Sequence, residues 1–155
     1  MAEAGAPGAS RPQSVLFMCG QNVIRSVMAE VLAKHYFGRS LYVASAGVRP
    51  GENDPFVAAA LDEIGLTIGK HRPHTLDDLD DLNFDLIVTL APEAHHAALD
   101  LTARYPVEVE YWPTVDPTMF EGGSREQTLE AYRNVRDSLD DRVRDRFRFA
   151  AKARV

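Results

Sequence analysis

Apolar runs and apolar residues at helical spacing alternate along the chain from residue 14 onward. Short continuous apolar runs are typical of strands covered on both faces, and a period near 3.6 indicates amphipathic helices. The predicted strands cover residues 14–18, 41–46, 84–90 and 107–112. The predicted helices cover 26–37, 54–65, 92–104 and a long closing segment from 124. This alternation predicts a three-layer α/β domain, with a four-stranded parallel sheet and helices on both faces.

Capping and turn residues set the expected ends of these elements. Asp54 followed by Pro55 is a strong helix start, and Ser124 with Gln127 forms a capping box. The acidic segment 75–82 is expected to be a short surface helix. We expect one domain over residues 14–147, because the remaining stretches lack an apolar period. Residues 1–13, rich in Ala, Gly, Pro and Ser, are expected to form a flexible tail, and residues 148–155 a fraying one.

Composition narrows the class of protein. The 155 residues carry a formal net charge of −6, which disfavours nucleic acid or an anionic membrane as the main partner. The chain has no apolar run near the roughly 20 residues that span a bilayer, and its N-terminus lacks the features of a signal peptide. Its single cysteine cannot form an internal disulfide, which fits a cytoplasmic protein with a free thiol.

The cysteine stands at the carboxyl end of the first predicted strand, where ligands bind in open parallel sheets. A loop follows Cys19, and Arg25 opens the next helix. Such a loop gathers free backbone N–H groups at the positive end of a helix dipole, which suits an oxyanion. The Arg25 guanidinium can donate two parallel hydrogen bonds to two oxygens of the anion. The Ser26 hydroxyl can donate a hydrogen bond to the sulfur. These groups would serve attack of Cys19 on phosphorus.

The alternative role for Cys19 is that of a small buried hydrophobic residue, a common fate of cysteine. A Cys-x5-Arg spacing alone is weak evidence, because it arises by chance in about one case in twenty. Its placement between a strand and a helix favours catalysis. The phosphate-binding loop would then comprise Gly20, Gln21, Asn22, Val23, Ile24 and Ser26.

The segment VLFMCGQNVIRSVMAE resembles the signature of the low-molecular-weight protein tyrosine phosphatases and the related arsenate reductases. That signature is a strand, then Cys-x-Gly-Asn-x-x-Arg-Ser-Pro, then Met-Ala-Glu. The resemblance continues with Ser-Ala-Gly at 45–47, His71, and Val-Asp-Pro at 115–117. It spans residues 14 to about 147 and implies a flavodoxin-like fold of the phosphotyrosine phosphatase I type.

The resemblance also implies roles for individual residues. Cys19 would be the nucleophile, Arg25 the phosphate clamp, and Asp116 the general acid that protonates the leaving oxygen and later activates water. Asn22 and Ser26 would join Ser45 and His71 in a hydrogen-bond network that braces the loop. From the residues alone, Asp116–Pro117 also fits an ordinary turn, and Ser45 and His71 fit surface polar positions.

Several positions depart from the family pattern. Gln21 replaces the loop glycine and would be strained if that position needed positive φ. Val27 replaces the proline at the helix start. Ile24 stands where many members have a second cysteine, so no neighbouring thiol can form a disulfide with Cys19. Thr118 and Met119 replace an aromatic pair that often walls the phosphotyrosine pocket, which leaves the preferred leaving group open.

We expect no cofactor and no metal. Adjacent His95 and His96 point about 100° apart on a helix, and the Asp77–Asp81 cluster fits a solvated face. The leading hypothesis is a metal-independent phosphatase acting on phosphorylated protein or a small aryl phosphate, with free phosphate and related oxyanions as inhibitors. The alternatives are an arsenate reductase that uses an external thiol, and a phosphate- or phosphopeptide-binding module without turnover.

Overall fold

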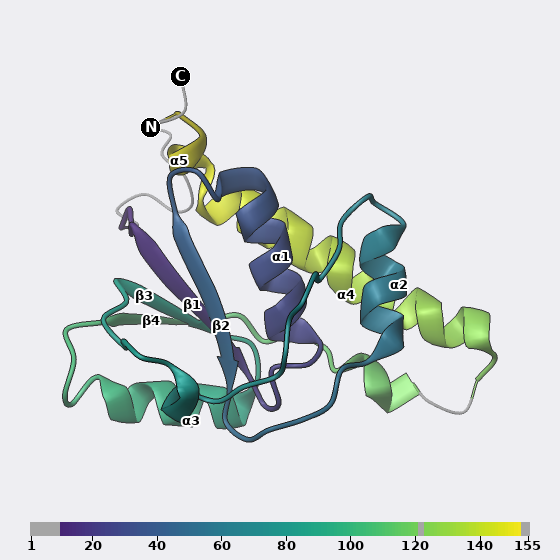
Figure 1. The fold of residues 1–155 in the computed structure, drawn as a ribbon, viewed down its shortest axis with the longest axis horizontal. Coiled ribbons are helices and arrows are strands. Elements are labelled where there is room, and N and C mark those ends of the chain that lie inside the picture. Colours follow the sequence, from purple (N-terminus) through teal and green to yellow (C-terminus); the bar gives the residue numbers. More distant parts are fainter. Residues whose placement is uncertain (1–9, 121–122, 153–155) are drawn as a thin grey trace.

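The chain forms one parallel four-stranded sheet with helices on both faces, which confirms the predicted architecture (Figure 1). The computed structural model describes residues 10–120 and 123–152. The strands are β1 (Ser14–Cys19), β2 (Tyr42–Gly47), β3 (Leu86–Thr89) and β4 (Glu108–Tyr111). The helices are α1 (Arg25–Phe37), α2 (Pro55–Asp62), α3 (Pro92–Leu101), α4 (Arg125–Arg146) and α5 (Arg148–Lys152), with 3-10 turns η1 (Leu76–Asp78) and η2 (Pro117–Phe120).

The strand order β2-β1-β3-β4 brings the carboxyl ends of all four strands to one edge of the sheet. Cys19 pairs with Gly47 at the end of β2, and Thr89 of β3 pairs with Tyr111 of β4. Because every pairing is parallel, the loops that follow β1, β2, β3 and β4 emerge together. The residues after these strands can therefore build one site.

Strand β1 supplies alternate side chains to two cores. Val15, Phe17 and Cys19 belong to the larger core, with apolar residues of α1, α2 and α4. Leu16 and Met18 belong to the smaller core, with Ala94, Ala98 and Leu101 of α3. The burial of β1 on both faces explains its continuous apolar run.

The capping residues occupy the predicted helix ends. The Asp54 carboxylate accepts a hydrogen bond of 2.9 Å from the Phe56 N–H at the start of α2. Ser124 and Gln127 form a reciprocal capping box at the start of α4. Segment 75–82 forms only the short turn η1, because Leu76, Leu79 and Leu82 turn inward onto the smaller core.

The two predicted tails differ from the structure where it describes them. Residues 1–9 lie outside the described part, but Ser10 is held by hydrogen bonds of 2.8 and 3.0 Å from the Arg146 guanidinium. Residues 148–152 form α5 instead of a frayed end, because Phe147 is fully buried against Phe17 and Phe37. Residues 153–155 lie outside the described part. Over the described ranges, no helix is both long and apolar enough to cross a membrane.

Candidate active site

Cys19 lies at the end of β1 with its side chain almost fully buried. Its sulfur is 2.9 Å from the hydroxyl oxygen of Ser26, which is buried in the first turn of α1. When the sulfur is a thiolate, the hydroxyl is the donor in this contact. Ser26 is thus placed to stabilise negative charge on the Cys19 sulfur.

Asn22 determines the path of the loop between β1 and α1. It is buried and has φ of 59°, the only positive φ of a non-glycine residue in the described ranges. Its amide donates hydrogen bonds of 2.9 Å to the hydroxyl oxygens of Ser26 and Ser45. Its side-chain oxygen accepts one of 3.1 Å from the His74 N–H. The residue in the left-handed conformation is thus Asn22, and asparagine tolerates this conformation. Gln21 does not have a positive φ, so the strain expected from its replacement of a glycine is absent.

Gly47, at the end of β2, lets this loop approach the sheet. A Cβ atom at Gly47 would lie 2.7 Å from the Asn22 nitrogen, a distance that real side chains do not tolerate. The glycine of the Ser-Ala-Gly motif therefore has a steric role. It allows the loop to lie against the end of β2.

The structure brings Ser45 and His71 to the same loop residue. The Ser45 hydroxyl accepts from the Asn22 amide and donates to the Glu30 carboxylate, which also pairs with Lys34 at 2.6 Å. The His71 Nε2 lies 3.1 Å from the Asn22 carbonyl oxygen. Glu30, the last residue of the Met-Ala-Glu motif, and the His74 backbone complete this network, although sequence reasoning assigned neither a role.

Arg25 connects the loop to two other strand ends. Its Nη1 donates to the Thr114 carbonyl oxygen at 3.0 Å and to the Leu90 carbonyl oxygen at 3.4 Å. Leu90 follows β3 and Thr114 follows β4, so the half-buried guanidinium is anchored at one corner. Within residues 10–120 and 123–152, its other N–H groups make no hydrogen bond.

Asp116 precedes turn η2 and is held by Thr118. The Asp116 Oδ1 accepts hydrogen bonds from the Thr118 N–H at 2.9 Å and the Thr118 hydroxyl at 2.7 Å. Both bonds fall on the same oxygen. Among the described residues, the other carboxylate oxygen, Oδ2, therefore has no hydrogen-bond donor.

One cavity of about 150 Å³ joins the three predicted catalytic residues. Cys19, Arg25 and Asp116 all lie on its wall, although Asp116 is about 90 residues from the other two in the sequence. The remaining lining residues are Gly20, Gln21, Val23, Ile24, Arg49, Glu93 and Thr118. Asn22, Ser26, Ser45 and His71 are not among these residues and hold the loop from behind.

Arg49 and Glu93 are cavity residues that sequence reasoning missed. Arg49 follows β2, Glu93 lies in the first turn of α3, and the two side chains form an ion pair. The wall therefore carries two arginines and two carboxylates in all, with Arg25 and Asp116 as the other two. No local sequence pattern identifies such a pair, because its members come from separate elements that only the fold brings together.

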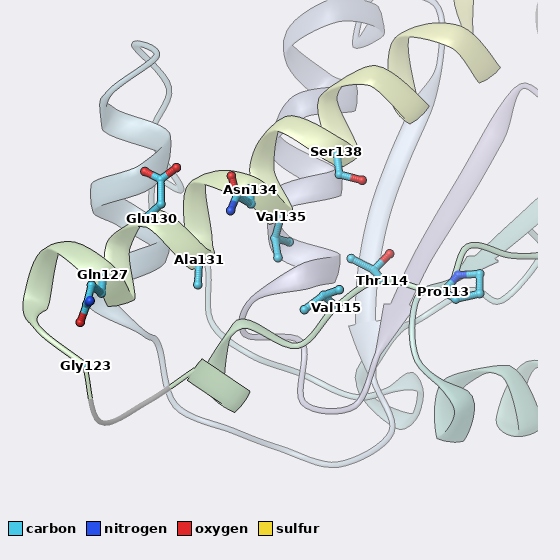
Figure 2. Close-up of a pocket in the computed structure, with 10 residues that line it drawn as sticks. All are labelled: Pro113, Thr114, Val115, Gly123, Gln127, Glu130, Ala131, Asn134, Val135 and Ser138. Carbon is cyan, nitrogen blue, oxygen red and sulfur yellow. The ribbon is translucent and has the colours of Figure 1, made fainter.

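A larger cavity of about 550 Å³ is lined by residues 113–115, by Gly123 and by residues of α4 (Figure 2). Figure 2 shows Thr114 and Val115 on one side and α4 residues such as Ala131 and Val135 on the other. Among the described residues, its wall combines apolar and neutral polar side chains with Glu130, but holds no cysteine, histidine or arginine. It therefore lacks the nucleophile and cation that oxyanion chemistry needs.

Within residues 10–120 and 123–152, no group of three or more His, Cys, Asp or Glu side chains is arranged to hold a metal ion. His95 instead forms a 3.0 Å hydrogen bond with the Thr89 hydroxyl and stacks on Tyr111. These contacts give His95 a structural role at the ends of β3 and β4.

The sequence matches a family model described as low molecular weight phosphotyrosine protein phosphatase over residues 14–153. A curated relative from Bacillus subtilis (strain 168), named arsenate reductase, is 32% identical over 133 residues. The alignment covers 84% of this chain and 92% of that relative.

Two solved structures show the same architecture. A structure described as an arsenate reductase in the phosphate binding state has a TM-score of 0.68 and 26% identity, covering 90% of this chain and 98% of that one. The tyrosine phosphatase AmsI of Erwinia amylovora has a TM-score of 0.72, covering 96% of this chain and 98% of that one. Its identity of 21% makes it a likeness of fold alone.

Proposed function

This chain belongs to the low molecular weight phosphotyrosine protein phosphatase family, and from this premise we propose that it hydrolyses phosphomonoesters through a phosphorylated Cys19. The observation that carries the proposal is the cavity whose wall holds Cys19, Arg25 and Asp116 together. Each group that phosphate ester hydrolysis requires is present on this one chain. The reaction needs no second cysteine and no metal.

The first step transfers the phosphoryl group to the enzyme. The Cys19 sulfur attacks phosphorus, the S–P bond forms and the bond to the ester oxygen breaks. Asp116 gives its proton to that oxygen, so that a neutral alcohol or phenol leaves. Arg25 and the backbone N–H groups of the loop hold the non-transferred oxygens, where negative charge is concentrated.

The second step releases phosphate. Asp116, now a carboxylate, takes a proton from a water molecule that attacks the phosphorus. The S–P bond breaks and Cys19 leaves as a thiolate, stabilised by the Ser26 hydroxyl 2.9 Å away. A cytoplasmic setting, where the thiol stays reduced, is part of this proposal.

The test is hydrolysis of p-nitrophenyl phosphate in the presence of a chelator, by wild type and by Cys19→Ser. We expect chelator-insensitive turnover by wild type and a loss of more than about a thousandfold in Cys19→Ser, as for other enzymes that lose their nucleophile. Unchanged turnover by Cys19→Ser would exclude the mechanism. Tight binding of phosphate with no released nitrophenol would favour a binding module instead.

The role of Asp116 is tested with leaving groups of different basicity. We expect Asp116→Asn to lower kcat by about 100-fold or more with phenyl phosphate, whose phenolate needs a proton to leave. The loss with p-nitrophenyl phosphate should be smaller, because nitrophenolate leaves without one. Equal losses with both esters would assign Asp116 a structural role only.

Arsenate reduction is the second candidate, and the name of the Bacillus subtilis relative favours it. Cys19 would attack the arsenic atom of arsenate and displace one oxygen as water. Because the chain has a single cysteine, an external thiol must then attack the Cys19 sulfur and release arsenite, leaving a mixed disulfide. A second external thiol would free Cys19. Formation of arsenite from arsenate and glutathione, with only weak p-nitrophenyl phosphate turnover, would favour this reaction over ester hydrolysis.

A further inference from the structure

The Arg49–Glu93 ion pair borders the Cys19 cavity but takes no part in the two steps proposed above. The Arg49 Nη1 donates to the Glu93 Oε2, and both side chains lie on the cavity wall. The side chains are 54% and 42% exposed. Ion pairs this exposed contribute little to folding, so stability does not account for a charged pair beside the nucleophile.

Glu93 is the fixed member of the pair. It lies in the first turn of α3, where the helix dipole favours a carboxylate. A Cβ atom at Gly20 would lie 2.5 Å from the Glu93 Oε1, so this carboxylate sits against the residue that follows Cys19. The absence of a side chain at Gly20 is what lets a negative charge approach the loop so closely.

Arg49 is the movable member. It lies in the irregular segment between β2 and α2, where its backbone N–H donates to the Gly20 carbonyl oxygen at 3.0 Å. The backbone is therefore fixed, whereas the long side chain is held at its end by an exposed ion pair. Moving the Arg49 guanidinium away from Glu93 costs little, because an ion pair this exposed is weak, and Glu93 is then open to a cation on the substrate.

The cavity is too small to hold a whole substrate, so the parts beyond the phosphoryl group must lie near the Arg49–Glu93 ion pair. A space of about 150 Å³ holds a phosphoryl group and part of the group attached to it, but is well below the roughly 300 Å³ or more of a site for a larger ligand. Groups that flank the phosphorylated residue must therefore lie at the rim. The net charge of −6 for the whole chain adds a field that attracts basic groups.

We propose that Glu93 is a specificity-determining residue that favours phosphorylated peptides with a Lys or Arg next to the phosphorylated residue. Arg49 serves as the counterion of Glu93 until the substrate supplies one. This inference rests on the proposed phosphatase function, and it names the class of substrate for that site.

The test measures binding separately from turnover. Three phosphotyrosine peptides that differ only in a flanking Lys, Gln or Glu are titrated against Cys19→Ser, in which the nucleophile is absent. We expect the Lys peptide to bind about fivefold more tightly than the Gln peptide, as for one partly exposed charge pair. Adding Glu93→Gln should bring this ratio close to one. Glu108→Gln removes the same charge from the exposed start of β4 and should leave the ratio unchanged.

Other results would overturn the inference. A Lys preference that persists in Glu93→Gln would assign it to other residues. Tightest binding of the Glu peptide, lost in Arg49→Gln, would make Arg49 the recognition residue and an acidic flank the preferred one. No peptide binding, with p-nitrophenyl phosphate still hydrolysed by wild type, would reject the peptide substrate but leave the phosphatase mechanism standing. If wild type neither bound a peptide nor hydrolysed p-nitrophenyl phosphate, the peptide specificity and the phosphatase mechanism would both be rejected.

Discussion

Asn22 carries the hydrogen bonds that shape the loop after Cys19. Its amide donates to two serine hydroxyls and its side-chain oxygen accepts from the His74 backbone. The same residue adopts the left-handed conformation in which the loop turns back toward α1. Position 22 therefore combines a conformational requirement with three polar contacts. Substitutions can separate the contributions of these two features to the free energy of unfolding.

We expect Asn22→Ala to lower the free energy of unfolding by about 3 kcal/mol, because it removes buried hydrogen bonds and leaves a Cβ in the left-handed region. Asn22→Gly removes the same bonds without the conformational cost and should lose about 1 kcal/mol less. Urea unfolding followed by circular dichroism measures both values. If Asn22→Ala were as stable as wild type, the loop would not depend on this network.

The sequence predicted three residues that line one cavity, Cys19, Arg25 and Asp116, better than it predicted their surroundings. Cys19 and Arg25 flank one short loop, so their spacing is visible in the sequence. Asp116 was singled out by the family resemblance, because the Asp-Pro pair alone also fits an ordinary turn. Glu93 contacts a loop more than 70 residues away, and such contacts have no local signal. The position of the left-handed residue also depends on partners outside the loop.

Helices α2 and α4 are joined by a carboxylate between two arginines. Glu63, at the end of α2, accepts hydrogen bonds from Arg133 and Arg136 of α4. The hydrogen bonds from Arg133, followed by the one from Arg136, lower the pKa of the Glu63 carboxyl from 4.5 to about 2. The stabilisation that this contact between α2 and α4 provides therefore depends on pH.

A lowered pKa in the folded state means that the ionised form of Glu63 stabilises the fold. This contribution is complete above pH 4.5 and is lost as the pH falls toward 2. We expect Glu63→Gln to lower Tm at pH 7 and the difference from wild type to shrink steadily between pH 4.5 and 2. Glu108→Gln, at an exposed position of β4, is the matched control. A difference in Tm that stays constant over this range would contradict the linkage.

Element boundaries were predictable where a capping residue defines them. Asp54 and Ser124 accept the hydrogen bonds that their sequence context predicts, and α2 and α4 begin there. The end of α4 was less predictable. α5 continues the chain because Phe147 packs among aromatic residues of β1 and α1, and a charged, arginine-rich segment gives no sign of that burial.

On the scale of the whole molecule, Arg146 ties both ends of the described chain to the sheet. Its Nε donates to the Glu110 carboxylate of β4 at 2.9 Å, and its other nitrogens donate to Ser10. The side chain is buried, with only 6% of the residue exposed. The segment before β1, the last strand and the last long helix thus meet at one arginine.

We expect Arg146→Ala to lower the free energy of unfolding by about 2–3 kcal/mol, because it leaves Glu110 with a partly buried, uncompensated charge. Arg144→Ala, two residues away, removes an exposed arginine and should cost less than about 1 kcal/mol. Chemical unfolding gives the two values. Hydrogen exchange should also show faster exchange near residues 10–13 in Arg146→Ala alone. Equal effects of the two substitutions would contradict the anchoring role.

Covalent phosphorylation of Cys19 during turnover tests the proposed mechanism most directly. The wild-type chain is mixed with p-nitrophenyl phosphate, quenched in acid during the first turnovers, and analysed by mass spectrometry of the intact chain and its peptides. The mechanism predicts one added phosphoryl group, located on Cys19, and none in Cys19→Ser treated in the same way. Release of phosphate at the wild-type rate with no phosphorylated Cys19 at any time point would contradict it.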